Sequence, residues 1–366
     1  MNEFLNFLRA NYSELLVLTR EHIFITLLST GLAVAVGLPL GILLTRVERL
    51  QTPVLGIANV MQTVPSLALF GLLIPIPFIG GIGSRTAVIA LALYALLPII
   101  RNTVTGILGI DPKVRESATA LGMTSGQILR SVELPLAAPV ILTGIRVAVV
   151  ISVGVATVAA AVGAGGLGTY IFRGLRQNDN NLLLAGALAS ALLALLCDFA
   201  LGQVERSFKI GERRTGIQRL AFGSAAFMLV ATVGASYISN FRSEISSNSA
   251  ALAGEGRKVV VGSKDFTESV ILAEILAQTL EKQGVEVVRQ FELGGNLAHD
   301  GLLSGQIDVY PEYTGTAYTA ILKHPPLTDP QAVYDATKQE YAEKFGLTLS
   351  RPLGFANDFA ILVRAG

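Results

Sequence analysis

The stretch DPKVRESATALGMTSGQILRSVELPLAAP, residues 111–139, is polar and charged, although long apolar segments flank it on both sides. Asp111 is a suitable helix cap, and Pro112 fits the first helical position because its missing N–H would have no partner there. Gly122 is expected to end this helix, since glycine readily adopts the left-handed conformation of a C-terminal cap. The first half of the stretch therefore predicts a short polar helix.

A second helix is predicted directly after the first. Thr124 and Gln127 form a T-x-x-Q capping box, which is typical of a helix start. This helix is expected to stop before Pro135, because proline disfavours helical geometry in the residue ahead of it. The two helices together predict a short helical hairpin at the membrane surface.

Several positions of the hairpin carry a signature. They are Glu116, Ala118, Gly122, Leu134, Pro135 and Pro139. These residues stand where the EAA loop of bacterial ABC importer permeases has its Glu-Ala-Ala, glycine and Leu-Pro positions, so the hairpin resembles that loop; Ser117 replaces the first alanine. In that family the loop docks into a cleft of the ATPase subunit and transmits its closure to the pore, which implies an ATPase-coupling role here. An ordinary interfacial hairpin is the alternative.

The composition argues against a purely soluble protein, with 51% hydrophobic and 15% charged residues. The net charge of +1 favours neither a nucleic-acid binder nor an acidic tail. Cys197 is the only cysteine, so it is expected to pack as a small hydrophobe. The three histidines, His22, His299 and His324, have no metal-ligand spacing, and neither a metal nor another cofactor is expected.

Apolar segments long enough to cross a bilayer predict an all-α polytopic membrane bundle of about six spans. The predicted spans are residues 23–45, 54–78, 85–108, 137–163, 182–204 and 217–238. Residues 1–22 mix charge with Phe and Leu and are interpreted as a helix lying on the membrane surface. The transmembrane permease domain is therefore predicted to be residues 23–238.

The distribution of Lys and Arg predicts the orientation of this bundle. If residues 1–22 lie outside, the inner loops hold eleven of these cations and the outer segments five. This orientation places the hairpin in the cytoplasm and everything after residue 238 outside. The predicted location is a bacterial cytoplasmic membrane, crossed several times.

A second module follows the last predicted span. Residues 239–257 have the Ser-, Asn-, Ala- and Gly-rich composition of a flexible linker. Strands are then predicted at 258–262, 285–293, 307–310 and 360–364, with helices at 267–283 and 296–304. Such alternation is typical of a parallel α/β layer, so residues 258–366 are predicted to form an external α/β domain.

Two strings in this module, GSKDFTES at 262–269 and DVYPEYTGT at 308–316, closely resemble receptors for glycine betaine, choline and carnitine. These receptors are periplasmic-binding-protein-like shells of two lobes, and in some members they are fused behind the permease. The string GAGGLGTYIFRGL at 163–175 is similar to the permease of the same subgroup. Its G-x-G-x-x-G part is not interpreted as a dinucleotide site, because it follows a membrane span; close helix approach is the better explanation.

The resemblance implies a binding site for a quaternary ammonium, which has no N–H and is held by aromatic faces. Tyr310 matches a cage tyrosine of the family, and Tyr313 is a weaker candidate. Lys264, with the following helix N-terminus, would hold a substrate carboxylate. Further candidates are Asn296, Asn357 and Phe359. Ordinary packing and solvated loop charges are the alternative for all of them, and Asp308 and Glu312 are interpreted as residues that cap or brace the turn.

The family's receptor is about twice as long as residues 258–366. The domain is therefore expected to be truncated, either because the sequence is a fragment or because the receptor is incomplete. The rest of the aromatic cage would come from the missing part.

The expected partners follow from the resemblance and from one missing motif. The chain contains no G-x-x-x-x-G-K-[ST] phosphate loop, so ATP hydrolysis is expected on a separate cytoplasmic ABC ATPase. A second permease copy, a quaternary-ammonium substrate and a separate binding protein complete the expected set, without nucleic acid. A permease for another small solute such as an amino acid and a membrane-tethered ligand sensor are the alternatives; no residue set suggests an enzyme.

Overall fold

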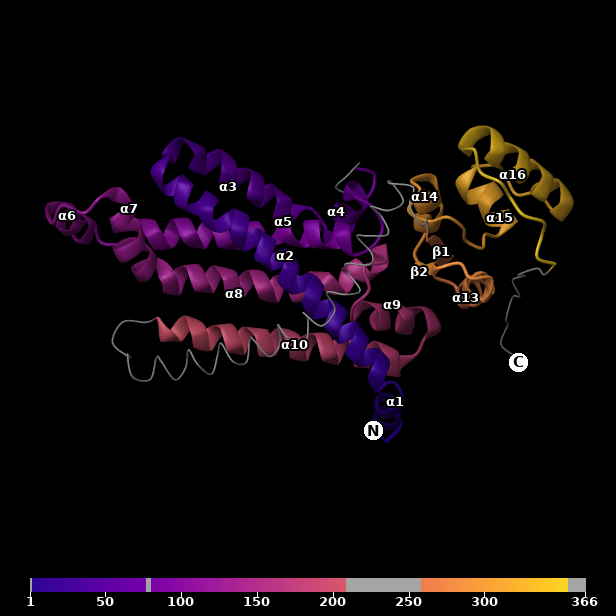
Figure 1. Ribbon diagram of the computed structural model, residues 1–366, viewed down its shortest axis with the longest axis horizontal. Coiled ribbons are helices and arrows are strands. Elements are labelled where there is room, and N and C mark those ends of the chain that lie inside the picture. The colour runs from indigo at the N-terminus through magenta and orange to yellow at the C-terminus, as the bar shows by residue number, and fades with distance from the viewer. Residues whose placement is uncertain (1, 77–79, 209–257, 355–366) are drawn as a thin grey trace, which may run out of the picture. The chain divides into compact units, whose positions relative to one another are not determined.

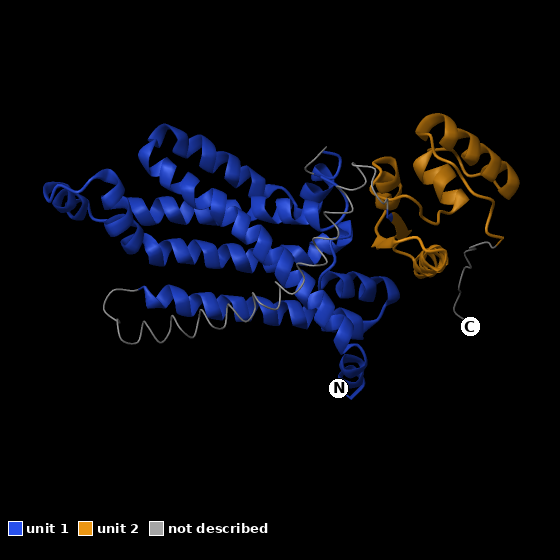
Figure 2. Cartoon of the chain, viewed as in Figure 1, with its two compact units in different colours: residues 1–258 blue, residues 259–366 orange. Residues whose placement is uncertain are grey.

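The computed structural model describes residues 2–76, 80–208 and 258–354. The chain forms two compact units, Met1–Lys258 and Val259–Gly366, each considered by itself (Figure 2). The predicted span 217–238, the predicted linker 239–257 and the predicted strand 360–364 lie outside the described residues. The count of about six spans is therefore not confirmed.

The first unit is a bundle of α-helices (Figure 1). Its main helices are α1 (Asn2–Ala10), α2 (Tyr12–Arg46), α3 (Glu48–Thr63), α4 (Ser66–Leu73), α5 (Ser84–Leu108), α8 (Leu134–Ala159), α9 (Gly168–Gln177) and α10 (Asn180–Ser207). Among the described residues, four helical segments are long and apolar enough to cross a membrane, and a fifth crossing results if the bent pair α3 and α4 is one span. The predicted helical membrane bundle is confirmed.

The N-terminal segment differs from the surface helix predicted for residues 1–22. Helix α2 begins at Tyr12, so residues 12–22 are continuous with the first span. Phe4 and Phe7 of α1 pack against a buried cluster that includes Leu18 and Tyr170. Apolar packing therefore holds this segment against the bundle.

The apolar segment 54–78 does not form the single straight helix that its hydropathy predicts. Helices α3 and α4 meet at an angle of 103°. The break falls at Val64, whose backbone is extended (φ −67°, ψ 126°), directly ahead of Pro65. Because the proline ring disfavours helical geometry in the preceding residue, the chain turns there.

Small residues allow the long helices to approach closely. A Cβ added to Gly41 of α2 would lie 2.6 Å from the Cβ of Thr103 in α5. A Cβ added to Gly144 of α8 would lie 2.6 Å from the Cβ of Asn102, also in α5. Close backbone approach of this kind is the usual basis of helix packing in membranes.

The glycine-rich loop at 163–168 serves the same purpose. A Cβ on Gly168 would lie 1.9 Å from the carbonyl oxygen of Thr157. The backbone N–H of Gly166 donates to the carboxylate of Glu21 in α2 at 2.8 Å. The predicted role in close helix approach is confirmed. Cys197 is buried in the apolar cluster around Leu193 and Leu201, as predicted.

The second unit contains a small parallel sheet. Strand β1 (Val259–Lys264) pairs in parallel with β2 (Val287–Leu293), in the register Val259 to Val287. Its helices are α13 (Thr267–Lys282), α14 (Leu297–Leu303), α15 (Thr314–Thr316), the π-turn η3 (Ala317–Ile321) and α16 (Pro330–Phe345). The predicted parallel α/β layer is confirmed.

The third predicted strand, 307–310, is reduced to a single bridge between Val261 and Val309. The N–H of Gly262 donates to the carbonyl of Val309, and the N–H of Asp308 donates to the carbonyl of Val260, both at 2.9 Å. The chain then leaves the sheet at Tyr310. Residues 308–313 are therefore brought to the carboxyl end of β1.

Candidate functional site

The hairpin begins with a capped helix, α6 (Pro112–Ala120). The carboxylate of Asp111 accepts the N–H of Lys113 at 2.9 Å, as the sequence predicts. Gly122 has φ +78°, and its N–H donates to the carbonyl of Thr119 at 2.9 Å. The left-handed glycine thus ends α6, and this prediction is confirmed.

The second helix, α7 (Ser125–Ile128), starts at the predicted capping box. The N–H of Gln127 donates to the hydroxyl of Thr124 at 3.4 Å, and the N–H of Thr124 donates to the side-chain carbonyl of Gln127 at 2.8 Å. The side chain of each of these two residues thus accepts the backbone N–H of the other, so two N–H groups at the start of the helix have a partner.

The prediction that this helix stops before Pro135 is wrong. Helix α7 continues through a π-turn, η1 (Leu129–Glu133), into α8, and Pro135 lies in the first turn of α8. The N–H of Leu134 donates to the carbonyl of Leu129, five residues earlier. The wider turn relieves the contact that the proline ring would otherwise make with the preceding turn.

The signature residues differ in how exposed they are to solvent. Ala118 is buried, Leu134 is partly buried, and Glu116, Gly122 and Pro135 are exposed. The hairpin projects from one end of the bundle, beyond the ends of α5 and α8 (Figure 1). Glu116 and Gly122 are therefore accessible to a partner, whereas Ala118 fixes α6 in place.

We predict that Gly122→Ala destabilises the hairpin by about 1–2 kcal/mol, because an L-residue is disfavoured at a left-handed backbone position. No heavy atom lies within 4 Å of the added Cβ, so the cost would arise from the backbone alone. Gly126→Ala is the matched control: it also has open space but lies in α7, where alanine is favoured over glycine. Amide hydrogen exchange in α6 and α7 would measure the stability of the hairpin in both variants. Equal protection in the two variants would contradict the prediction.

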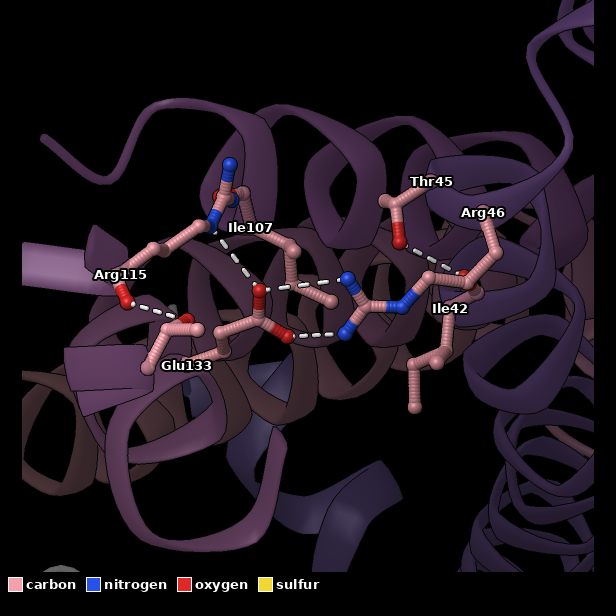
Figure 3. Close-up of polar contacts among 7 residues, drawn as sticks. Ile42, Thr45, Arg46, Ile107, Arg115 and Glu133 are labelled. Atoms are coloured by element: carbon pink, nitrogen blue, oxygen red, sulfur yellow. Dashed lines mark hydrogen bonds and ion pairs between the residues drawn. The ribbon is translucent and has the colours of Figure 1, made fainter. Parts of the chain in front are cut away.

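A buried carboxylate missed by the sequence reading lies at the base of the hairpin. Glu133, the last residue of η1, is fully buried and forms ion pairs with Arg46 at the end of α2 and Arg115 in α6 (Figure 3). Arg115 also donates to the carbonyl of Ile107 near the end of α5. Glu133 adjoins the recognised Leu-Pro pair, but nothing in the local sequence indicated its partners.

A second missed ion pair joins two membrane-spanning helices. Arg146 of α8 donates to both carboxylate oxygens of Asp198 in α10, at 2.7 and 2.6 Å, and to Glu205 at 3.2 Å. Charged residues within spans are rare and usually paired. A single Arg and a single Asp, 52 residues apart, gave no sequence signal for this contact.

In the second unit, the predicted ligand residues Lys264 and Tyr310 converge on Glu312. The ammonium of Lys264, whose side chain is 3% exposed, lies 2.7 Å from one oxygen of Glu312. The hydroxyl of Tyr310 donates to the other oxygen at 2.8 Å. Burial and the nearby carboxylate raise the pKa of the Tyr310 phenol, so it remains a donor at neutral pH.

Tyr313 joins the same cluster. Its backbone N–H donates to Glu312 at 2.8 Å, and its hydroxyl donates to Glu268 in the first turn of α13. Its ring meets Phe266 edge-on, with 6.1 Å between centroids. The cluster thus contains two tyrosines, two acidic groups and Lys264, and the bonds to Glu312 fit the alternative that this residue braces the turn.

The other predicted ligand residues are not part of this cluster. Asn296 is exposed and immediately precedes α14 without capping it through its side chain. Asn357 and Phe359 lie outside the described residues. Asp308 accepts the N–H of Val260 at 2.8 Å, which supports its predicted bracing role.

Buried polar groups without a hydrogen-bond partner lie beside the cluster. Both ring nitrogens of His299 and the hydroxyl of Tyr341 are buried, and none of them has a hydrogen-bond partner among the described residues. The ring centroids of His299 and Tyr341 are 5.4 Å apart. Burial lowers the pKa of His299, which disfavours the charged form of its ring. Nothing in the sequence distinguished it from a packing residue.

These features define a class of protein: a polytopic membrane permease subunit with an exposed hairpin at one end of its bundle and an attached α/β module. The sequence profile described as the binding-protein-dependent transport system inner membrane component matches residues 37–210. That of the substrate binding domain of the ABC-type glycine betaine transport system matches residues 257–366.

Two relatives and one solved structure are similar to parts or most of the chain. The chain is 46% identical over 203 residues to the osmoprotectant import permease protein OsmW of Salmonella typhimurium, covering 55% of this chain and 94% of OsmW. It is 34% identical over 344 residues to the ergothioneine transport permease/ergothioneine binding protein EgtU of Helicobacter pylori, covering 92% of this chain and 60% of EgtU. A solved structure of the MetNI methionine ABC transporter in an inward-facing conformation is 27% identical, with a TM-score of 0.49, over 52% of this chain and 94% of that chain.

The chain therefore belongs to the family of inner membrane components of binding-protein-dependent transport systems. It is a multi-pass inner-membrane transport subunit. A glycine betaine-type substrate-binding domain follows the permease in the same chain.

Proposed function

We propose that this chain is the membrane subunit of an ATP-driven importer of quaternary-ammonium osmoprotectants such as glycine betaine, choline and carnitine. The observation that carries the proposal is that one chain matches both osmoprotectant permeases and a glycine betaine-type binding domain. The part after about residue 238 would lie outside the cytoplasm and deliver ligand to the permease.

A separate cytoplasmic ABC ATPase would supply the energy. The exposed positions of Glu116 and Gly122 support docking of that subunit on the hairpin, with Ala118, Leu134 and Pro135 holding the hairpin in shape. A second copy of this chain would complete the translocation path. ATP-driven closure of the ATPase pair would then switch the path between inward-facing and outward-facing states.

The cluster around Glu312 would form part of the ligand cage. Tyr310 and Tyr313 offer aromatic faces to a cation, and Glu268 and Glu312 add negative charge. Lys264 already pairs with Glu312, so binding of a substrate carboxylate by Lys264 requires that pair to open. Asn296, Asn357 and Phe359 remain predicted ligand residues.

Substitutions at Tyr310 test this role. Tyr310→Leu is expected to weaken glycine betaine binding about 30-fold, since a desolvated cation–π contact contributes about 2 kcal/mol. Tyr310→Phe keeps the aromatic face and loses only the hydroxyl bonded to Glu312, so a smaller loss is expected. Calorimetric titration of the full chain would measure both. Equal affinities of the Leu and Phe variants would count against an aromatic cage.

The identity of the substrate needs a ligand panel. The relative EgtU, which matches both parts of the chain, is named for ergothioneine, a betaine that also carries a trimethylammonium group. Binding of ergothioneine in preference to glycine betaine and choline would make it the substrate. Preference for ordinary amino acids would favour a permease without an aromatic cage, and failure to retain an ATPase would favour a ligand sensor.

A further inference from the structure

The base of the hairpin contains an ionic junction between separate helices. Glu133 is fully buried (Figure 3). Both of its carboxylate oxygens contact the guanidinium of Arg46, with 3.3 Å between Nη1 of Arg46 and Oε1 of Glu133. Nε of Arg115 lies 2.9 Å from the same Oε1. Arg46 is the last residue of α2, and Arg115 lies in α6. One carboxylate therefore holds two cations from two different helices.

The same junction reaches a third helix end. Arg115 donates to the carbonyl of Ile107, in the last turn of α5. Carbonyls at a helix C-terminus carry partial negative charge and attract cations. The ends of α2, α5 and the π-turn leading into α8 thus meet at one point through Arg115 and Glu133.

Helix α6 has few other attachments. Of its nine residues, all described, only Ala118 is buried. Arg115 is therefore a principal side-chain connection between α6 and the bundle. Force applied to α6 would pass through Arg115 and Glu133 to Arg46, and so to α2.

Helix α2 is well placed to carry such a displacement further. Ala33 of α2 packs in one buried cluster with Ala95 and Ile99 of α5 and Ala148 of α8. Close-packed helices move as bodies rather than deform continuously. A shift at the Arg46 end would therefore alter how three membrane helices pack.

We propose that Glu133 is a positioning residue that couples movement of the ATPase-docking hairpin to α2 through its ion pairs with Arg115 and Arg46. This inference rests on the proposed function, because it requires an ATPase on the hairpin. Glu133 determines whether a hairpin movement reaches the membrane helices.

The test measures how much solute is transported for each ATP consumed. The protein would be purified from its native membrane through a tag on this chain, with the ATPase that it retains, and reconstituted in vesicles containing ATP. Uptake of glycine betaine and release of phosphate would be measured in the same vesicles. Glu133→Gln removes the charge with little change in shape.

Glu133→Gln is expected to lower uptake per ATP by about 2- to 30-fold, the range usual for residues that carry coupling between sites. The amount of retained ATPase should be unchanged. Arg46→Gln is expected to act in the same direction, and it leaves the pair between Glu133 and Arg115 intact. Arg49→Gln is the matched control, because Arg49 is exposed and makes no ion pair with any described residue.

Uptake and ATP hydrolysis that fall in the same proportion would overturn the inference, as would an equal effect of Arg49→Gln. If Glu133→Gln does not fold, Arg46→Gln decides the matter alone, since the side chain of Arg46 is 44% exposed and tolerates change better. The unsubstituted protein separates the two proposals: if it retains no ATPase, the proposed function and this inference both fail. If it couples normally and the variants do too, only the inference fails.

Discussion

Glu312→Ala is expected to destabilise the α/β module by about 3–5 kcal/mol, the usual cost of removing one partner of a buried ion pair. The reason is that the ammonium of Lys264 is almost fully buried and would lose its counter-ion. The hydroxyl of Tyr310 and the N–H of Tyr313 would also lose their acceptor. Since small domains are stable by about 5–15 kcal/mol, this loss would be a large fraction of the total.

Urea unfolding of the full chain, followed by hydrogen exchange in β1 and α13, would measure the effect. The double variant Lys264→Met with Glu312→Leu removes both charges and is expected to recover most of the stability. Glu343→Ala is the control, because Glu343 is exposed on α16 and its change should cost less than about 0.5 kcal/mol. A Glu312→Ala variant as stable as this control would show that the pair does not brace the module.

Glu116→Lys is expected to lower ATP-driven uptake about 30-fold or more, the effect of losing a residue that dominates an interface. Glu116 is exposed on α6, so reversing its charge should leave the fold of the hairpin unchanged and act on the docked partner. The measurement is the amount of ATPase that co-purifies with the chain, together with uptake of glycine betaine in vesicles.

Glu3→Lys is the matched control for this prediction, since it makes the same exchange on an exposed site in α1. It should leave both ATPase retention and uptake unchanged. If Glu116→Lys also retains the ATPase and transports normally, the hairpin is not the docking site, and the alternative of an ordinary interfacial hairpin is favoured.

The hairpin shows which features could be predicted from sequence. The caps at Asp111 and Thr124 and the left-handed Gly122 were all predicted, because each depends on residues within a few positions along the chain. The parallel pairing of β1 and β2 followed from the alternation of strands and helices.

The errors arose where a local rule competed with packing. Pro135 was expected to end a helix, but a π-turn ahead of it carries the helix into α8. Apolar contacts hold residues 12–22 in the first long helix, although their charge suggested a separate surface segment. Hydropathy alone could not show the sharp bend at Pro65, because it records composition and not direction.

The sequence by itself determined the membrane class, the capped hairpin and the parallel α/β module, because hydrophobic period, caps and turn residues act over short distances. Only the tertiary structure decided the partners of charged groups: Glu133 with Arg46 and Arg115, and Lys264 with Glu312. Glu133 and Arg46 are 87 positions apart in the sequence, and Lys264 and Glu312 are 48 positions apart. A buried charge must find a partner, but its choice depends on which helix ends and strand ends the fold brings together.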